Sequence, residues 1–163
     1  MSFYYQIIES PIGNLHAIAD EQSLWVLGHD TNIKALKEKF PEVMKKENEV
    51  IALVRKQLKE YFSGKRHDFD IPVTLKGTDF QCQTWKALSK IPYGKTVSYQ
   101  EQATKLRKPL AVRAVGRTNG LNPISIILPC HRVIAKSGHL TGYAGGLKAK
   151  EFLLELEKRH TDE

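Results

Sequence analysis

Three short apolar runs separated by two turn signals occupy the start of the chain, and they restrict the fold more than any other feature. The runs cover residues 3–8, 15–19 and 24–27, and residues 11–14 and 20–22 lie between them. The connecting segments contain Pro, Gly, Asn or Asp, which are typical of turns. Short runs joined by such turns predict an antiparallel β-meander.

Two helical patterns and one further apolar run follow the meander. Apolar residues at helical spacing predict a helix over residues 32–40, which Pro41 ends. Asn48 is a candidate N-cap for a second helix with one apolar stripe, and Gly64 suits the position just after its last turn. Residues 69–75 are a candidate strand.

The second half begins with a helix that Thr78 or Asp79 can cap, and two shorter helical patterns follow. We expect helices over residues 97–106 and 110–119, with a basic turn between them and Pro109 in the first turn of the second helix. Small residues line one side of this second pattern: Ala111, Ala114 and Gly116. Two helices joined by a short turn outline a helix-turn-helix.

After this helix pair, residues 124–128 form a β-branched run that predicts a buried strand. A Gly-rich turn region then leads into a final helix over residues 147–160. We therefore predict an α+β protein of two domains. Residues 1–76 form an antiparallel sheet with helices, and residues 77–163 form a mostly helical domain.

The net charge of +7 is distributed unevenly between these halves. Residues 1–79 carry 11 Lys or Arg and 12 Asp or Glu, a net charge of −1, whereas residues 80–163 carry 14 and 6, a net charge of +8. No acidic residue lies between Gln102 and Lys150. A stretch of one sign this long predicts a polyanionic partner, nucleic acid before an anionic membrane surface. The alternative is a cationic surface without a partner.

Composition limits the compartment and the metal chemistry. Two cysteines form neither a disulfide framework nor a four-thiolate zinc site. No apolar run approaches the roughly 18 residues of a membrane span, and the first residues lack the charged start and apolar block of a signal peptide. We expect a cytoplasmic protein with no metal site and no membrane association. We expect structural roles for His16, His29 and His67.

The candidate chemistry lies in the segment Pro129-Cys130-His131-Arg132-Val133, directly after the predicted strand. A thiol is a strong nucleophile only as the thiolate, which needs a nearby positive charge or a base. His131 and Arg132 are candidates, but His131 reaches the sulfur only if the chain bends after Cys130. An acid that orients this base has three candidates on the last helix: Glu151, Glu155 and Glu157. The alternative is that Cys130 is a small buried hydrophobe, as we expect for Cys82.

This segment, together with others in order along the chain, resembles the O6-alkylguanine-DNA alkyltransferases. The segments that carry the resemblance are residues 91–94, 97–99, 113–116, 122–123, 129–133, 142–147 and 150–151. The resemblance is dense over about half of the chain, from Phe80 to Glu157, and the first half matches only in outline. It is strongest to the bacterial constitutive, single-function members, which lack the regulatory domain of the adaptive-response protein.

The resemblance implies a suicide DNA-repair protein with a ribonuclease H-like N-terminal domain. It would transfer an alkyl group to Cys130 from the O6 of guanine, and the O4 of thymine is a second implied source. The S-alkylcysteine is not regenerated, so each molecule acts once. The thiolate and the alkyl group are the only reactants, so no cofactor is implied, and the sequence carries no phosphate loop or dinucleotide fingerprint.

The resemblance also assigns roles residue by residue. Cys130 matches the nucleophile, His131 the base that acts through a bound water, and Glu157 the acid that orients it. Asn122 matches the residue that braces the turn around the site. Tyr99 matches the tyrosine that hydrogen-bonds the flipped guanine and helps to neutralise the departing base.

The implied partner is double-stranded DNA with alkylated bases, bound through the minor groove by a monomer, with cooperative binding left open. Arg113 matches the finger that enters the stack in place of the flipped nucleotide. The neighbouring positions on that helix approach the groove: Ala111, Val112 and Ala114. The implied pocket positions are Ser125, Val133, Tyr143, Ala144 and Lys150. Ser125 stands where the human member of the family has a proline, which leaves alkyl preference open. Val112 and Arg117 replace smaller residues usual on the recognition helix, which leaves DNA affinity open.

Three other functions are compatible with parts of the sequence. A non-enzymatic damage sensor of similar fold would replace the reactive cysteine, usually with tryptophan, so Cys130 argues against it. A transcription factor would use the helix-turn-helix on a fixed operator but leaves the Cys-His-Glu set unexplained. A thiol hydrolase needs neither Arg113 nor the basic stretch.

Overall fold

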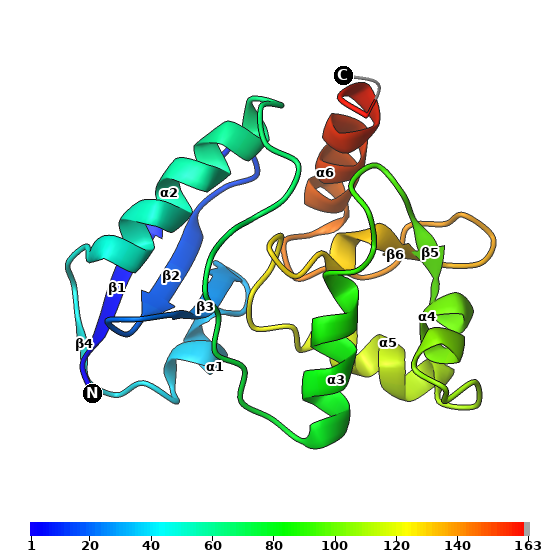
Figure 1. The fold of residues 1–163 in the computed structure, drawn as a ribbon, viewed down its shortest axis with the longest axis horizontal. Helices are drawn as coiled ribbons and strands as arrows, with labels where there is room; N and C mark the ends of the chain where they lie inside the picture. Colours follow the sequence, from blue (N-terminus) through cyan, green and yellow to red (C-terminus); the bar gives the residue numbers. More distant parts are fainter. Residues whose placement is uncertain (162–163) are drawn as a thin grey trace. The chain divides into compact units, whose positions relative to one another are not determined.

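The structure of the chain is a computed structural model that describes residues 1–161, and it forms two compact units. Unit 1 covers residues 1–75, and unit 2 begins at Lys76. Figure 1 shows a sheet with helices in unit 1 and mainly helices in unit 2. Over the described range, no helix combines the length and the apolar character needed to cross a bilayer.

Unit 1 is built on four strands: β1 (Phe3–Ile8), β2 (Leu15–Ala19), β3 (Leu24–His29) and β4 (Val43–Met44). Their order is β3-β2-β1-β4. The predicted meander is confirmed, because β1, β2 and β3 pair antiparallel, while β4 adds a parallel pair beside β1. Gly13, with φ +104°, makes the first turn. In the second turn the Asp20 carboxylate accepts hydrogen bonds from two backbone N–H groups at 2.7 Å.

Two helices belong to unit 1: α1 (Ile33–Lys37) and α2 (Glu49–Phe62). The second was predicted correctly, since Asn48 Oδ1 accepts a hydrogen bond from the Ile51 backbone N–H at 3.0 Å and Gly64 follows with φ +80°. Helix α1 is shorter than the predicted range 32–40. The side chain of Asn32 accepts from the His29 backbone N–H at 2.7 Å and does not cap the helix.

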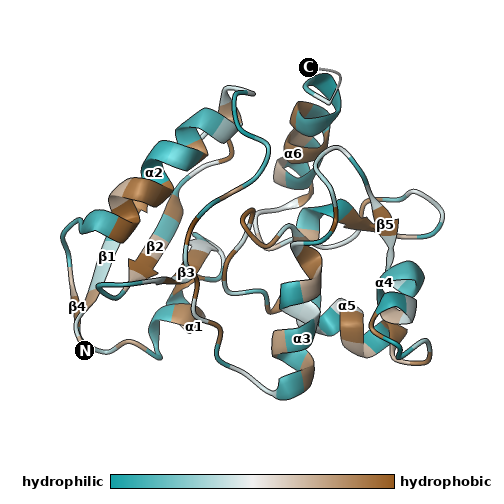
Figure 2. Ribbon diagram, viewed as in Figure 1, coloured by the Kyte–Doolittle hydropathy of each residue, from teal (hydrophilic) through white to brown (hydrophobic). Residues whose placement is uncertain are grey.

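The core of unit 1 includes buried side chains of the sheet and α2 and a cluster of Ile18, Val26 and Phe40, against which Ile33 and Leu36 of α1 pack. Figure 2 shows apolar residues on the strands and both apolar and polar residues along α2, as expected for a helix with one buried face. The fully buried side chains include Leu15, Ile18, Leu24, Leu27, Ile51, Val54, Leu58 and Tyr61.

The predicted strand over residues 69–75 is wrong, because this segment makes only an isolated bridge between Val73 and Leu24. Leu24 donates its backbone N–H to the Pro72 carbonyl at 2.9 Å and accepts from the Thr74 backbone N–H at 2.9 Å. Pro72 has no N–H to contribute, so the ladder extends no further.

Unit 2 contains four α-helices, one 3₁₀ helix and a two-stranded parallel ladder among its described residues. The elements are α3 (Asp79–Leu88), β5 (Val97–Ser98), α4 (Tyr99–Lys105), α5 (Val112–Gly120), η1 (Cys130–Arg132), β6 (Val133–Ile134) and α6 (Leu147–Arg159). With the sheet of unit 1, this confirms the predicted α+β class, with an N-terminal sheet and a mostly helical C-terminal part.

Capping decides where the helices of unit 2 begin. Thr78, and not Asp79, caps α3 through a reciprocal capping box with Gln81. Ser98 forms the same arrangement with Glu101, so α4 begins at Tyr99 and not at the predicted residue 97. Residues 97–98 are instead paired with β6.

Two further predictions in unit 2 need correction. Helix α5 begins at Val112, so Pro109 precedes the helix and Leu110 is 99% exposed. The run at 124–128 is no strand. It makes a turn in which Ile126 has φ +72°, a left-handed conformation that is costly for a β-branched residue.

Candidate active site

A side chain, and not a strand, holds the turn before the cysteine. Asn122 Nδ2 donates to the Leu128 carbonyl at 2.7 Å, and Asn122 Oδ1 accepts from the Ile124 backbone N–H at 3.0 Å. The amide therefore satisfies the backbone groups that a neighbouring strand would otherwise pair. Cys130 follows as the first residue of η1, which supplies the bend that the sequence required after it.

Cys130 lines a pocket of about 450 Å³ within unit 2. The volume lies in the range of pockets that enclose small molecules. The twelve lining residues are Tyr99, Val112, Gly116, Asn119, Gly120, Asn122, Ser125, Cys130, Thr141, Gly142, Tyr143 and Ala144. Of the residues assigned from the sequence, seven share this wall: Tyr99, Val112, Asn122, Ser125, Cys130, Tyr143 and Ala144.

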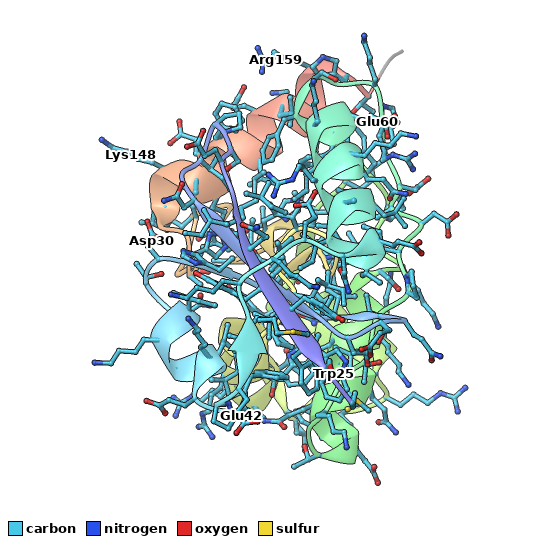
Figure 3. All side chains as sticks on the ribbon, turned by 90° about the vertical axis from the view of Figure 1, so that its left-hand side faces the viewer. Trp25, Asp30, Glu42, Glu60, Lys148 and Arg159 are labelled. Atoms are coloured by element: carbon cyan, nitrogen blue, oxygen red, sulfur yellow. The ribbon has the colours of Figure 1, made fainter. Side chains whose placement is uncertain are left out.

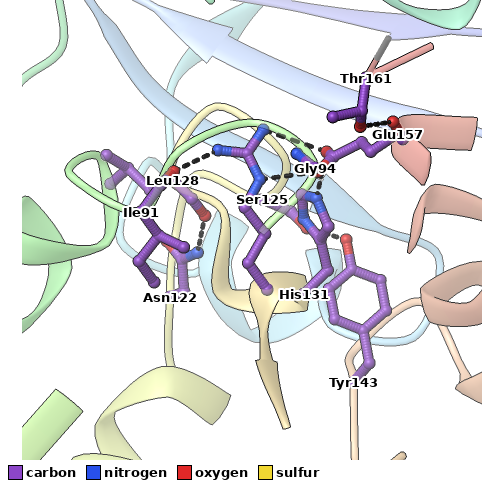
Figure 4. A network of polar contacts seen from close by, with 10 residues as sticks. Ile91, Gly94, Asn122, Ser125, Leu128, His131, Tyr143, Glu157 and Thr161 are labelled. Carbon is purple, nitrogen blue, oxygen red and sulfur yellow. Dashed lines mark hydrogen bonds and ion pairs between the residues drawn. The ribbon is translucent and has the colours of Figure 1, made fainter. Parts of the chain in front are cut away.

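The two residues that follow the cysteine form a buried ion-pair network with Glu157 of α6 (Figure 4). His131 Nε2 is 2.7 Å from Glu157 Oε2. Arg132 donates from Nε to Glu157 Oε1 at 2.8 Å and from Nη2 to Oε2 at 3.1 Å, and its Nη1 donates to the Ile91 carbonyl at 2.6 Å. Of the three acids that the residue pattern left open, Glu157, the one that the resemblance selected, contacts the histidine, while Glu151 and Glu155 are exposed.

The network fixes the protonation states of its members. Burial opposes the charge on Glu157, but hydrogen bonds and charges from His131 and Arg132 outweigh it and lower the Glu157 pKa to about 2. Burial lowers the pKa of His131 below its ordinary value, so the ring is neutral near pH 7. Because Nε2 faces a carboxylate, it carries the proton, and Nδ1 is left as a lone-pair acceptor. Across residues 1–161, this Nδ1 has no hydrogen-bond partner.

The thiol itself is held in its protonated form. Burial raises the pKa of Cys130, against a hydrogen bond with Asn122 and the charge of Lys150. The expectation that Arg132 supplies positive charge to the sulfur needs correction. Its guanidinium is occupied by Glu157 and by a carbonyl, and Lys150 is the cation that acts on the thiol. Activation therefore calls for a base.

Lys150 is 1% exposed and joins two segments of the site. Its Nζ donates to the Val133 carbonyl at 2.8 Å and to the Thr141 carbonyl at 3.2 Å. Tyr143 is held by a hydrogen bond of 2.6 Å between its hydroxyl and that of Ser125. Burial raises the Tyr143 pKa, so the hydroxyl stays protonated.

Helices α4 and α5 form the predicted helix-turn-helix. The side-chain amides of Gln102 and Asn119 exchange two hydrogen bonds, at 3.0 and 2.8 Å, in the buried contact between the helices. Trp85 Nε1 donates to the Thr118 carbonyl at 2.8 Å and fastens α5 to α3. The sequence pattern gave no indication of these pairs.

The residues of α5 divide between the solvent and the pocket. Arg113 is exposed and does not line the pocket. Val112 and Gly116 lie on the pocket side, where a Cβ added to Gly116 would lie 3.6 Å from the Tyr99 ring. This distance is ordinary van der Waals contact, so the ring packs beside α5 at Gly116 without requiring a glycine there. Ala111 precedes the helix and Ala114 is half-buried.

A pocket-lining cysteine, a buried His-Glu pair and an adjoining helix-turn-helix are the features expected of a protein that combines thiol chemistry with DNA binding, and comparisons agree with this. Residues 3–75 match the family described as "6-O-methylguanine DNA methyltransferase, ribonuclease-like domain". Residues 79–159 match "6-O-methylguanine DNA methyltransferase, DNA binding domain". The chain belongs to the 6-O-methylguanine DNA methyltransferase family, which confirms the resemblance found in the sequence and the ribonuclease-like character of unit 1.

Individual relatives cover nearly the whole chain. The methylated-DNA–protein-cysteine methyltransferase of Methanosarcina barkeri is 48% identical over 157 residues, which are 96% of this chain and 98% of the relative. The protein of that name from Mycobacterium tuberculosis is 46% identical, over 95% of this chain and 92% of its own. A crystal structure of M. tuberculosis O6-methylguanine methyltransferase has a TM-score of 0.84 at 42% identity and covers 97% of this chain and 94% of its own.

One solved relative contains nucleic acid. The crystal structure of M. tuberculosis OGT in complex with DNA has a TM-score of 0.85 at 44% identity, and the match covers 96% of this chain and 94% of that chain. The DNA-binding domain and this complex confirm DNA as the partner that the resemblance implied, and they agree with the nucleic acid predicted from the charge.

Proposed function

We propose that this protein repairs DNA in the cytoplasm by moving an alkyl group from O6-alkylguanine to Cys130, once per molecule and irreversibly. The observation that carries this proposal is the buried His131–Glu157 pair, whose unpartnered Nδ1 lies on the residue next to a pocket-lining thiol. O4-alkylthymine, which presents an alkyl carbon on a similar exocyclic oxygen, is the proposed second substrate.

The proposed reaction is an in-line displacement at the alkyl carbon. His131 Nδ1 takes the thiol proton through a bound water, and Glu157 stabilises the imidazolium that forms. The sulfur then forms a bond to the alkyl carbon as the bond from that carbon to O6 breaks. The electron pair of the broken bond stays with the guanine, which finally takes up a proton. The S-alkylcysteine has no route back to the thiol, so the protein is consumed.

The remaining pocket residues orient the reactants. Asn122 holds the turn and hydrogen-bonds the thiol, and Lys150 ties the segment after the nucleophile to the loop that carries Thr141. Tyr99 donates a hydrogen bond to the guanine as negative charge develops on it. The guanine would be enclosed by Ser125, Val133, Tyr143 and Ala144.

The target atom is inaccessible inside a duplex, so the nucleotide has to be turned out at a cost of a few kcal/mol. Arg113 is exposed on α5 and fills the vacated stack. We propose that α5 enters the minor groove, where readout is largely independent of sequence and therefore suits a search for damage. Ala111, Val112 and Ala114 allow close approach there. A monomer is sufficient for each of these steps.

Titration of lesions tests the proposal. A duplex carrying one O6-methylguanine is mixed in excess with the protein, and the methylated base that remains is counted at completion. We expect the loss to stop at one lesion per protein molecule, with none lost for Cys130→Ser and full activity for Cys82→Ser. Continued turnover contradicts the suicide reaction. Tight binding without any loss identifies a damage sensor, and preference for one sequence regardless of damage identifies a transcription factor.

A further inference from the structure

Thr141 is hydrogen-bonded both to Tyr99, which is proposed to face the leaving guanine, and to Lys150, which holds the segment after the nucleophile. Its Oγ1 is hydrogen-bonded to the Tyr99 hydroxyl. Its carbonyl accepts from Lys150 Nζ, which also donates to the Val133 carbonyl. Lys150 therefore ties the loop that carries Thr141 to the segment that follows Cys130. The Thr141 side chain contacts Tyr99, the residue proposed to face the leaving guanine.

Tyr99 is constrained along its whole length. It is the first residue of α4, directly after the Ser98 cap, so its backbone is fixed by the capping box. Its ring packs beside α5 at Gly116, where an added Cβ would be in ordinary van der Waals contact with it at 3.6 Å. Its hydroxyl meets Thr141 in the same pocket wall. The phenol can thus change its hydrogen-bond partners with little movement of the ring.

We propose that Thr141 is a positioning residue for alkyl transfer, which donates its hydroxyl hydrogen to Tyr99 Oη while Tyr99 donates its own to a ring nitrogen of the departing guanine. This role rests on the proposed function. A threonine hydroxyl can donate and accept at once, so it can serve the phenol oxygen in either direction.

The relay assists the bond-breaking half of the reaction. As the bond from the alkyl carbon to O6 breaks, its electron pair spreads over the guanine ring, and the hydrogen bond from Tyr99 to the ring strengthens. A second donor on the phenol oxygen makes the phenol a better donor, because hydrogen bonds in a chain polarise one another. No proton has to leave Thr141, and the proton taken from the thiol balances the one that the guanine gains.

Three variants separate this role from a structural one. Thr141→Val has nearly the same shape, lacks the hydroxyl and keeps the backbone carbonyl that anchors Lys150. Thr141→Ser keeps the hydroxyl. Tyr99→Phe removes the group on which Thr141 is proposed to act. For each, and for the Tyr99→Phe/Thr141→Val double variant, the single-turnover rate at saturating O6-methylguanine duplex and the affinity for the same duplex are measured separately.

We expect Thr141→Val to slow transfer about five- to tenfold, the effect of one hydrogen bond, with duplex affinity unchanged within about twofold. Thr141→Ser restores the rate. In the Tyr99→Phe protein, adding Thr141→Val has no further effect, since the relay is already broken. Three results overturn the proposal: an unchanged rate in Thr141→Val, equal losses in the Val and Ser variants, or additive losses in the double variant. Methyl transfer to Cys130 in the unmodified protein is independent of these outcomes, so failure of the relay leaves the proposed function intact.

Discussion

His131 Nε2 lies 2.7 Å from Glu157 Oε2, and the two side chains are 0% and 1% exposed. This contact joins η1 to α6 across 26 positions of the chain. The same carboxylate accepts two hydrogen bonds from Arg132 and a longer one from the Gly94 backbone N–H at 3.3 Å. One carboxylate therefore contacts the proposed base and also accepts a hydrogen bond from the loop that contains Gly94.

Replacing that acid should damage both folding and chemistry. Glu157→Gln leaves the buried Arg132 guanidinium without a counter-charge, and breaking a buried pair costs about 3–5 kcal/mol. We expect a loss of that size in urea unfolding and a slower methyl transfer, because the orientation of His131 is no longer enforced. Glu155→Gln is the matched control, since Glu155 is exposed on the same helix. Equal stability of the two variants contradicts the role of the network.

The pH dependence of transfer tests the base. The pKa of His131 lies below the ordinary value of about 6.5. The ring is therefore already neutral at pH 8 and stays neutral as the pH falls to that value. The single-turnover rate should be flat over this range and fall only at lower pH. If the thiol had to ionise unaided, its raised pKa would make the rate increase about tenfold per pH unit across the same range. His131→Gln should show that second profile.

The proposed finger makes a prediction that depends on the substrate. Arg113→Ala should keep its rate on free O6-alkylguanine bases, which need no extrusion, and lose about 10- to 100-fold on duplex DNA. Arg117→Ala, also exposed on α5, should change the duplex rate by less than about threefold. Equal losses on both substrates for Arg113→Ala would show that this arginine supports the pocket and not the flipped state.

Unit 1 carries its own pH dependence. His29 is 3% exposed, and burial, with the charge of His16 added, lowers its pKa to about 4 although Asp30 opposes this. Figure 3 shows Asp30 at the edge of the structure, where its side chain is 69% exposed and 2.6 Å from His16 Nε2. Because the pKa of His29 is lower in the folded protein, the unfolded chain takes up a proton at this residue at a higher pH than the folded protein does. Stability is therefore complete above about pH 6.5 and falls as the pH decreases toward 4.

The expected loss over that window is about 3 kcal/mol, at about 1.4 kcal/mol per pKa unit. Chemical unfolding followed at pH 7 and pH 4.5 measures it in a Trp85→Phe background, where Trp25 fluorescence reports on unit 1. His29→Gln should remove most of the difference between the two pH values. An undiminished difference in that variant would place the sensitive group elsewhere.

Local patterns predicted those elements whose ends are set locally. Asn48, Gly64 and the turns of the meander act through neighbours in sequence, and the structure shows them as predicted. The strand predicted over residues 124–128 was wrong, although the contact that replaces it is also local. The Asn122 side chain makes the hydrogen bonds that the backbone of this run was expected to make in a strand. Periodicity contains no information on such a side-chain substitute.

The site residues also divide into those that neighbours in the sequence indicate and those that only the fold brings together. Cys130 and His131 were predicted as a pair because they are adjacent in the sequence. Composition alone could not choose among three acids, and only the resemblance selected Glu157, which the structure places beside the ring. Thr141 was missed because its importance lies in hydrogen bonds to Tyr99 and Lys150, which come from two different helices. The charge pattern indicated the partner but not the position of a pocket among the helices.

The most direct test is the intact mass of the protein after incubation with a duplex that contains one O6-methylguanine, followed by peptide mapping. We expect a gain of one methyl group in exchange for one hydrogen, located on Cys130, with Cys82 unmodified and no gain in Cys130→Ser. An unchanged mass after the lesion has been bound, or a methyl group found on any other residue, would contradict the proposed transfer.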